Sequence, residues 1–248
     1  LARYNSDMRT QRDLKTGTIQ GDLVLLKSLM KFAKKMGGMK GIIPDSPKFK
    51  KQTKVPRFLT PEEEVAILGF FTHAGDQDMV DVVTVLIDTG LRVAREGLPM
   101  KPEHVDLKRN VILIPDSKSS TPRSVPLTKR ARTILKRRML AAKPGRGPFG
   151  TLRYHTIAQR WRNMRDALDL ASSEKSFTFH ICRHTFCTRL VSAGIDLKTV
   201  QTLAGHEDIT TTMNYVHFIP KEMFKITDAL ESQAIPKGDP KGNLKVIK

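Results

Sequence analysis

Two short stretches of the sequence place histidine, arginine and tyrosine where they could act on a phosphate group. His180 and Arg183 lie three residues apart in His180-Ile-Cys-Arg-His184, so they share one face if the segment is helical. Further along, His206 directly follows the helix-ending Gly205, and Tyr215 lies in the next stretch of helical pattern. A cation beside a proton carrier suits a phosphate, and a phenol can serve as a nucleophile.

Two further basic residues lie upstream and complete a set that could break a phosphodiester without a metal. Arg92 follows an apolar helix and its glycine in Thr89-Gly-Leu-Arg92, and Lys118 falls in the turn of a predicted β-hairpin. Such a cleavage needs a nucleophile, cations around the phosphorus, and an acid for the departing oxygen.

A metal site is a weaker interpretation of the same histidines. His180 and His184 have the spacing of a zinc protease helix, but Ile181 stands where that pattern needs glutamate. The sequence has no Cys-x-x-Cys pair and no acidic run with the spacing of a calcium or magnesium site. The two cysteines, Cys182 and Cys187, would face different sides of a helix and form no disulfide, which favours a reducing cytoplasm.

The charge of the 248-residue chain indicates a polyanionic partner. The formal net charge is +18 and the isoelectric point about 10.1. Nucleic acid is the favoured partner, because each phosphate neutralised by Lys or Arg releases counterions. A membrane is disfavoured, since no apolar run has the length of a spanning helix and no signal peptide is evident. We expect Lys54, Arg57 and Arg123 to bind DNA.

The chain order predicts two helical parts joined by a basic linker. Apolar residues recur at helical spacing from Asp22 to Met36, and a stretch rich in Pro and Lys follows. Thr60-Pro61-Glu62-Glu63 then has the capping box of a new helix. We therefore expect a partial helical DNA-binding domain at 1–50, a linker at 51–58, a larger domain at 59–234 and a flexible tail at 235–248.

The larger domain is predicted to be mainly helical α+β with a small antiparallel sheet. The expected strands are Val105–Leu107, Val111–Ile114 and Ser124–Leu127. An apolar segment at Met79–Ile87 precedes them. The expected helices after the sheet are Lys129–Ala142, Thr156–Leu170, Ile181–Ala193, Leu197–Leu203, Ile209–His217 and Pro220–Gln233.

Five motifs in fixed order make this chain resemble the tyrosine recombinase (phage integrase) family. They are Thr-Gly-Leu-Arg92, the hairpin Lys118, His180-x-x-Arg-His-Thr-Phe, Leu-x-Gly-His206 and Tyr215. The resemblance runs from about Thr60 to His217 and extends more weakly to the N-terminal helix, which resembles the end of that family's core-binding domain.

The resemblance implies a mechanism and a set of partners. Tyr215 would attack the scissile phosphate and form a 3′-phosphotyrosyl bond, with no metal or other cofactor. Arg92, Arg183 and His206 would surround the phosphorus, Lys118 would protonate the leaving oxygen, and His180 would assist. Four protomers would bind double-stranded DNA and act on two DNA sites. The helix at 220–233 would dock on a neighbouring protomer. Whether accessory DNA-bending proteins also take part is left open by the resemblance.

The first motif departs from the family pattern, in which an acidic residue follows the arginine by three positions. Arg95 occupies that position here, and Glu96 follows it. A one-residue insertion would restore the register and let Glu96 brace Arg92. Three other functions stay open: a type IB topoisomerase, a DNA-binding regulator that does not cut, and a zinc hydrolase.

Overall fold

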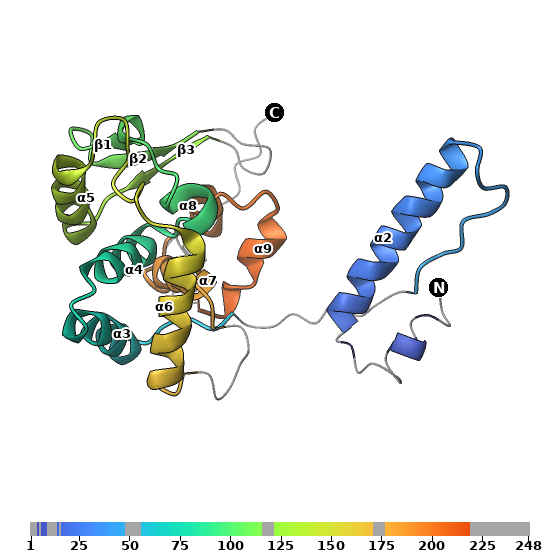
Figure 1. Ribbon diagram of the computed structural model, residues 1–248, viewed down its shortest axis with the longest axis horizontal. Coiled ribbons are helices and arrows are strands. Elements are labelled where there is room, and N and C mark those ends of the chain that lie inside the picture. The colour runs from blue at the N-terminus through green and yellow to red at the C-terminus, as the bar shows by residue number, and fades with distance from the viewer. Residues whose placement is uncertain are drawn as a thin grey trace, which may run out of the picture. The chain divides into compact units, whose positions relative to one another are not determined.

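The computed structural model describes residues 4, 6–8, 14, 16–47, 56–115, 122–170 and 177–218 (Figure 1). The chain divides into two compact units, Leu1–Thr53 and Lys54–Lys248. The described elements are mostly helices, with one three-stranded antiparallel sheet, so the predicted fold class is confirmed. Within these described ranges, no helix combines the length and apolar character needed to cross a membrane.

The first unit contains the long helix α2, Thr16–Lys35, which begins earlier than the sequence pattern predicted. Ile19 and Leu23 explain the difference, because they lie one turn apart and are 0% and 1% exposed. The apolar residues Val24, Leu25, Leu29 and Phe32 on the rest of the helix are more than half exposed.

The second unit begins with two helices that have side-chain caps. In α3, Pro61–His73, the predicted capping box is present: the Thr60 hydroxyl accepts from the Glu63 amide at 3.2 Å, and the Glu63 carboxylate accepts from the Thr60 amide at 3.1 Å. Asp76 caps α4, Gln77–Thr89. Most of α4 is buried, which makes it the central core helix rather than an amphipathic surface helix.

The sheet follows a π-helical turn at Val93–Gly97 (η1) and a 3-10 turn at Pro102–His104 (η2). Its strands are β1, Val105–Asp106, β2, Val111–Ile114, and β3, Arg123–Pro126, in the order β1-β2-β3. Ile112 pairs with Val125 in register, and both side chains are fully buried. Because side chains alternate along a strand, this register also turns Arg123 toward the core.

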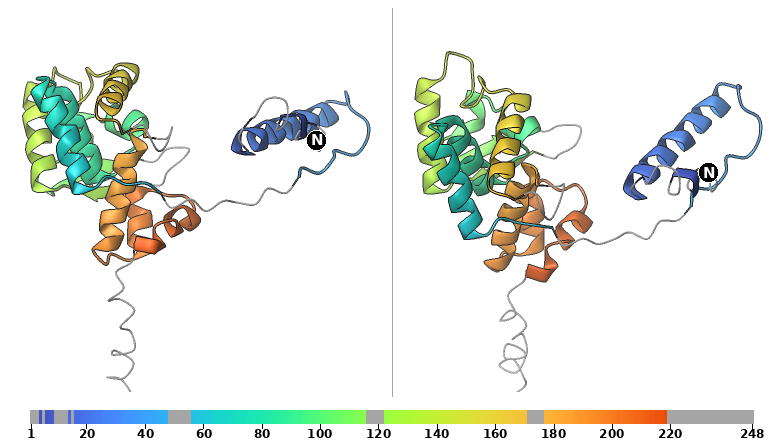
Figure 2. Two further views of the ribbon diagram at one scale, coloured as in Figure 1. Left: turned by 90° about the horizontal axis from the view of Figure 1, so that it is seen from below. Right: turned by 60° about the horizontal axis from the view of Figure 1, so that its bottom comes forward.

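Helix α7 packs against α4 and also against the C-terminal elements α8 and η3, while α5 packs against α4 (Figures 1 and 2). The bounds of the remaining described elements are α5 Lys129–Ala141, α6 Tyr154–Ala167, α7 His180–Ser192, α8 Leu197–Ala204, α9 Ile209–Met213 and η3 Val216–Phe218. The helix predicted at 220–233, most of the linker and the tail lie outside the described residues.

The single helix predicted at Ile209–His217 is wrong. The chain forms the short α9 and then turns at Asn214 and Tyr215 before the 3-10 helix η3. The Tyr215 amide bonds to the Thr212 carbonyl at 3.0 Å, a tighter pattern than an α-helix. Thr212 is fully buried. Tertiary contacts therefore determine the conformation of this segment, and the α-helix does not continue through it.

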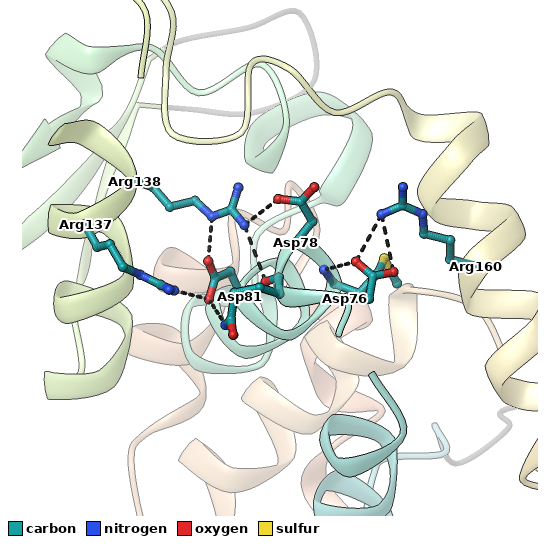
Figure 3. Close-up of polar contacts among 8 residues, drawn as sticks. Asp76, Asp78, Asp81, Arg137, Arg138 and Arg160 are labelled. Atoms are coloured by element: carbon teal, nitrogen blue, oxygen red, sulfur yellow. Dashed lines mark hydrogen bonds and ion pairs between the residues drawn. The ribbon is translucent and has the colours of Figure 1, made fainter. Parts of the chain in front are cut away.

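A network of acidic and basic side chains, centred on the buried Asp81, fixes α4 against its neighbours (Figure 3). Asp81, whose side chain is 2% exposed, binds Arg137 at 2.5 Å and Arg138 at 2.6 Å, both from α5. Arg138 also binds Asp78 at 2.7 Å, and Arg160 of α6 binds the capping residue Asp76 at 3.1 Å. Figure 3 shows these arginines converging on the first turns of α4 from two sides.

We expect Asp81→Ala to lower the free energy of unfolding by about 3 kcal/mol, because it leaves the mostly buried Arg138 without its main partner. Asp78→Ala is the matched control: its side chain is 42% exposed, so the loss should be below about 1 kcal/mol. Urea denaturation followed by circular dichroism measures both. Equal losses for the two variants would contradict the role assigned to Asp81.

Candidate active site

The end of α4 brings the segment of Arg92 next to α7. Gly90 has φ of 63°, a left-handed conformation that few side chains tolerate. A Cβ atom at this position would lie 2.4 Å from the Phe186 ring of α7, so the close approach requires glycine. The Gly90 carbonyl accepts a hydrogen bond from Arg183 Nη1 at 2.9 Å, which joins the two segments directly.

Arg92 is held by Glu96 through a π-helical turn. The Gly97 amide donates to the Arg92 carbonyl and the Leu98 amide to the Val93 carbonyl, at 3.0 and 2.9 Å. This wider turn accommodates the extra residue Arg95 and returns Glu96 to Arg92. One Glu96 oxygen accepts from Arg92 Nη1 and the other from the Arg92 amide, each at 2.8 Å.

One more contact fixes the Arg92 guanidinium. Its Nη2 donates to the Gly205 carbonyl at 2.8 Å, which ties it to the end of α8. Burial raises the pKa of Glu96, but hydrogen bonds from Arg123 and Arg92 outweigh it and leave that pKa below its usual value. Glu96 therefore stays ionised and keeps the guanidinium oriented.

Arg123 lies inside the protein, which differs from its expected place on a DNA-binding surface. Its side chain is 1% exposed and donates to Glu96 at 2.9 Å and to the Leu203 carbonyl at 2.9 Å. It packs beneath Gly205, where an added Cβ would lie 2.6 Å from Nη1. In this position Arg123 braces Glu96 and the turn before His206. The inward alternation of Arg123, Val125 and Leu127 is the sequence signal that could have placed it there.

We expect Arg123→Met to slow DNA cleavage by about ten- to a hundredfold, because Glu96 loses a partner and a small displacement of Arg92 is costly. The measurement is the rate of covalent adduct formation with protein in saturating excess. Combining the change with Glu96→Gln should add little, since both act through one contact. Weakened DNA affinity with an unchanged cleavage rate would instead support a direct DNA contact.

Arg183 contributes a buried guanidinium with an unused donor. It is 5% exposed, and while Nη1 binds Gly90, Nη2 has no hydrogen-bond partner among the described residues. Burial, with repulsion from Arg92, lowers its pKa to about 10, so it stays charged at neutral pH. An unpaired charged donor in the interior is costly, and an anion would satisfy it.

His180 and Arg92 line one open cavity of about 340 Å³. The cavity lies between η1, the start of α7 and Tyr154 at the start of α6. Burial lowers the pKa of His180, and the charges of Arg183 and Arg92 lower it further. His180 is therefore within the electrostatic influence of both arginines. It also lines a cavity that a phosphate could enter.

His206 follows Gly205, whose φ of 67° ends α8 and turns the chain back. Its Nδ1 lies 2.9 Å from the Thr212 hydroxyl, and its ring is parallel to that of Tyr215 within 4°. Burial lowers its pKa to about 3, with contributions from Arg183 and Arg92, so the ring is neutral at pH 7. When Thr212 donates to Nδ1, the Nε2 hydrogen is available to an anion.

Tyr215 is the most deeply buried of these groups, at 1% exposure. Its hydroxyl lies 2.6 Å from Nδ1 of His184. Burial and the neighbouring Cys187 raise the pKa of the phenol, while the charge of Arg183 opposes that rise. The hydroxyl is therefore stored in its protonated form.

The structure thus brings together five of the six predicted catalytic residues, namely Arg92, His180, Arg183, His206 and Tyr215. The sixth, Lys118, lies outside the described residues, as does Lys54. Arg57 is engaged within the protein: it binds Glu63 at 2.6 Å and covers the Phe177 ring at 4.6 Å. The sequence pattern gave His184 no place among the predicted catalytic residues, although its shared face with His180 was a usable signal.

Within the part of the chain that the structure describes, no group of three or more His, Cys, Asp or Glu side chains is arranged to hold a metal ion. Both cysteines are buried and free. The described groups form a cationic site with a phenol, and such a site can bind a phosphodiester and attack it.

Comparison with known proteins agrees with this site. Residues 57–222 match the model of the phage integrase family. Because the match covers more than half of the 248 residues, the chain belongs to that family.

Two curated relatives illustrate the similarity. The tyrosine recombinase XerA of Saccharolobus solfataricus is 32% identical over 140 residues, which cover 56% of this chain and 45% of the relative. The tyrosine recombinase XerD of Listeria innocua is 34% identical over 152 residues, covering 57% and 50%. The chain therefore spans about half the length of these relatives.

Solved structures show the same fold. The integrase of the Tn1549 transposon in complex with transposon right end DNA has a TM-score of 0.71 at 22% identity, covering 93% of this chain and 83% of that one. The XerH site-specific recombinase bound to its difH substrate has a TM-score of 0.68 at 19% identity, covering 93% and 69%.

Proposed function

We propose that this protein is a metal-independent site-specific DNA recombinase that cuts and rejoins DNA through a 3′-phosphotyrosyl intermediate on Tyr215. The observation that carries the proposal is that hydrogen bonds to Gly205 and Gly90 bring the Arg92 and Arg183 guanidiniums to one site with His206, whose ring is parallel to that of Tyr215. The phosphotyrosyl ester conserves the energy of the broken bond, so a new strand can be joined without ATP.

The two arginines and His206 stabilise the transition state in this proposal. Negative charge develops on the non-bridging oxygens as the phosphorus becomes five-coordinate. The unpaired Nη2 of Arg183 and the Nε2 hydrogen of His206 are donors suited to those oxygens. Arg92 is held by the Glu96 carboxylate and the Gly205 carbonyl. It adds a second guanidinium charge from the segment that follows α4. His180 lines the entrance beside Arg92 and assists in holding the phosphate.

Departure of the 5′ oxygen needs a proton donor, and Lys118 is assigned that role from its place between β2 and β3. Arg123 lies at the start of β3 and binds Glu96, so the base of this hairpin is tied to the brace of Arg92. This link supports a single site built from both segments.

The domain roles and the assembly are part of the same proposal. Residues 59–234 form the catalytic domain, residues 1–50 part of a core-binding domain, and 51–58 a basic linker that contacts phosphates through Lys54. The net charge of +18 supports double-stranded DNA as the partner. Four protomers on two DNA sites, with accessory DNA-bending proteins, complete the expected assembly.

The test uses nicked duplexes that trap the covalent intermediate. Cleavage near a nick releases a short strand that diffuses away, so the protein stays attached to DNA. We expect a band that resists denaturant when duplexes from the flanking genome are used, and mass spectrometry should find the nucleotide on the peptide containing Tyr215. Relaxation of supercoils without strand exchange between two sites would favour a topoisomerase. Binding with no adduct on any duplex would contradict the proposal.

A further inference from the structure

His184 is the residue in closest polar contact with the proposed nucleophile. It lies one turn after His180 on α7, and its Nδ1 is 2.6 Å from the Tyr215 hydroxyl. Cys187 follows three residues later on the same helix and contributes to the raised pKa of that phenol. Of these two groups the imidazole is the one that can accept a proton at neutral pH, because it is neutral there and keeps an acceptor nitrogen.

We propose that His184 is a further catalytic residue, the base that takes the phenolic hydrogen when Tyr215 attacks phosphorus. The inference rests on the proposed function and adds a residue to its mechanism. Imidazole is a common general base in enzymes, and a base must lie within about 3.2 Å of the proton it removes. The contact seen here meets that requirement before any DNA is bound.

The other histidines of the site are less suited to this task. His206 lies parallel to the phenol, 6.4 Å away between ring centres, and its Nδ1 is taken by Thr212. No hydrogen bond joins His206 to Tyr215 in the described part of the chain. His180 is at the exposed start of α7 and lines the cavity beside Arg92, and no hydrogen bond joins it to Tyr215 among the described residues.

The surroundings keep His184 neutral and ready to accept a proton. Burial, together with the charges of His180 and Arg183 on the same helix, lowers its pKa to about 4. The other titratable groups near the contact are Cys187 of α7 and His206 and Tyr215 of the C-terminal segment. As the phosphorane gains negative charge, that charge stabilises the imidazolium, so proton transfer becomes easier along the reaction path.

The proposed step balances in both directions. The O–H bond of Tyr215 breaks and its hydrogen moves to Nδ1 of His184, while the phenolic oxygen forms a bond to phosphorus. The bond from phosphorus to the 5′ oxygen breaks, and that oxygen takes a proton from the acid assigned to Lys118. In rejoining, the 5′ hydroxyl returns its proton to the neutral amine assigned to Lys118 as its oxygen bonds to phosphorus. The bond from phosphorus to the phenolic oxygen breaks, and the His184 imidazolium returns its proton to that oxygen.

The experiment separates a base for the nucleophile from an acid for the leaving group. The amide oxygen of His184→Asn can occupy the place of Nδ1 and accept a hydrogen bond, but it cannot hold a proton. Single-turnover cleavage is measured on two nicked duplexes, one natural and one with sulfur in place of the 5′ bridging oxygen. The pKa of a thiol is much lower than that of the 5′ alcohol, so the sulfur leaves as a thiolate and needs no proton from an acid. His155→Asn, at an exposed position of α6, is the matched control.

We expect His184→Asn to slow cleavage of both duplexes by about a hundredfold, the lower range for general base catalysis. Lys118→Ala should slow only the natural duplex, and His155→Asn neither. Cleavage by His184→Asn at the normal or a higher rate would overturn the proposal, because His184 would then merely hold a resting tyrosine. Restoration by sulfur would also overturn it, since His184 would then act on the leaving group.

Two further measurements keep the result interpretable. DNA affinity and melting temperature are compared with the unsubstituted protein, and His184→Gln replaces the asparagine variant if that one fails to fold. If the unsubstituted protein forms no adduct with either duplex, the proposed function fails; if it forms one and the His184 variants cleave normally, only the role of His184 fails.

Discussion

Tyr215→Phe is expected to abolish the covalent protein-DNA adduct while DNA binding is retained. The substitution removes only the attacking oxygen, and the Tyr215 ring is the phenol that lies parallel to His206 at this site. Because the hydroxyl is bonded to His184 in the interior, its loss should also lower the free energy of unfolding by about 1 kcal/mol. Denaturing gels measure the adduct and mobility shifts measure the binding.

The control removes a phenolic hydroxyl from the other unit of the chain. Tyr4 donates to Asp22 at 3.0 Å, and Tyr4→Phe should leave the adduct unchanged. If Tyr215→Phe still forms the adduct, the nucleophile lies elsewhere, and Tyr154 at the edge of the cavity becomes the first residue to test.

Arg183→Ala is expected to lower the single-turnover cleavage rate by about a thousandfold. Its Nη2 is a charged donor that the described residues leave unpaired, so its bond to the phosphate replaces no existing contact. Loss of one preorganised donor costs about a hundred- to a thousandfold, and the charge places Arg183 at the upper end. Arg183→Lys should restore little, because a single ammonium cannot bind both Gly90 and the phosphate as the planar fork does.

A control for net charge is Arg109→Ala in the turn between β1 and β2, where the side chain is 81% exposed. With protein in saturating excess, its cleavage rate should match that of the unsubstituted protein. A full rate for Arg183→Lys would indicate that charge alone suffices, which would contradict the geometric role of the guanidinium.

Local patterns in the sequence predicted most elements of the larger unit. The capping box at Thr60 and the apolar strands around Ile112 and Val125 were sufficient, because caps and alternation are local properties. The helix predicted at Ile209–His217 failed because Thr212 and Tyr215 are drawn into the interior by His206 and His184. The contact of Tyr215 with His184 joins residues 31 apart in sequence, so no local pattern reports it.

The sequence by itself determined the family motifs, the residue types of the site and the excess of positive charge. Only the tertiary structure decided how these residues are used. It placed Arg123 inside as a brace, returned Glu96 to Arg92 through a π-helical turn, and set His184 against Tyr215. The physical reason is that burial and hydrogen-bond partners assign a side chain its role, and both depend on which distant segments meet.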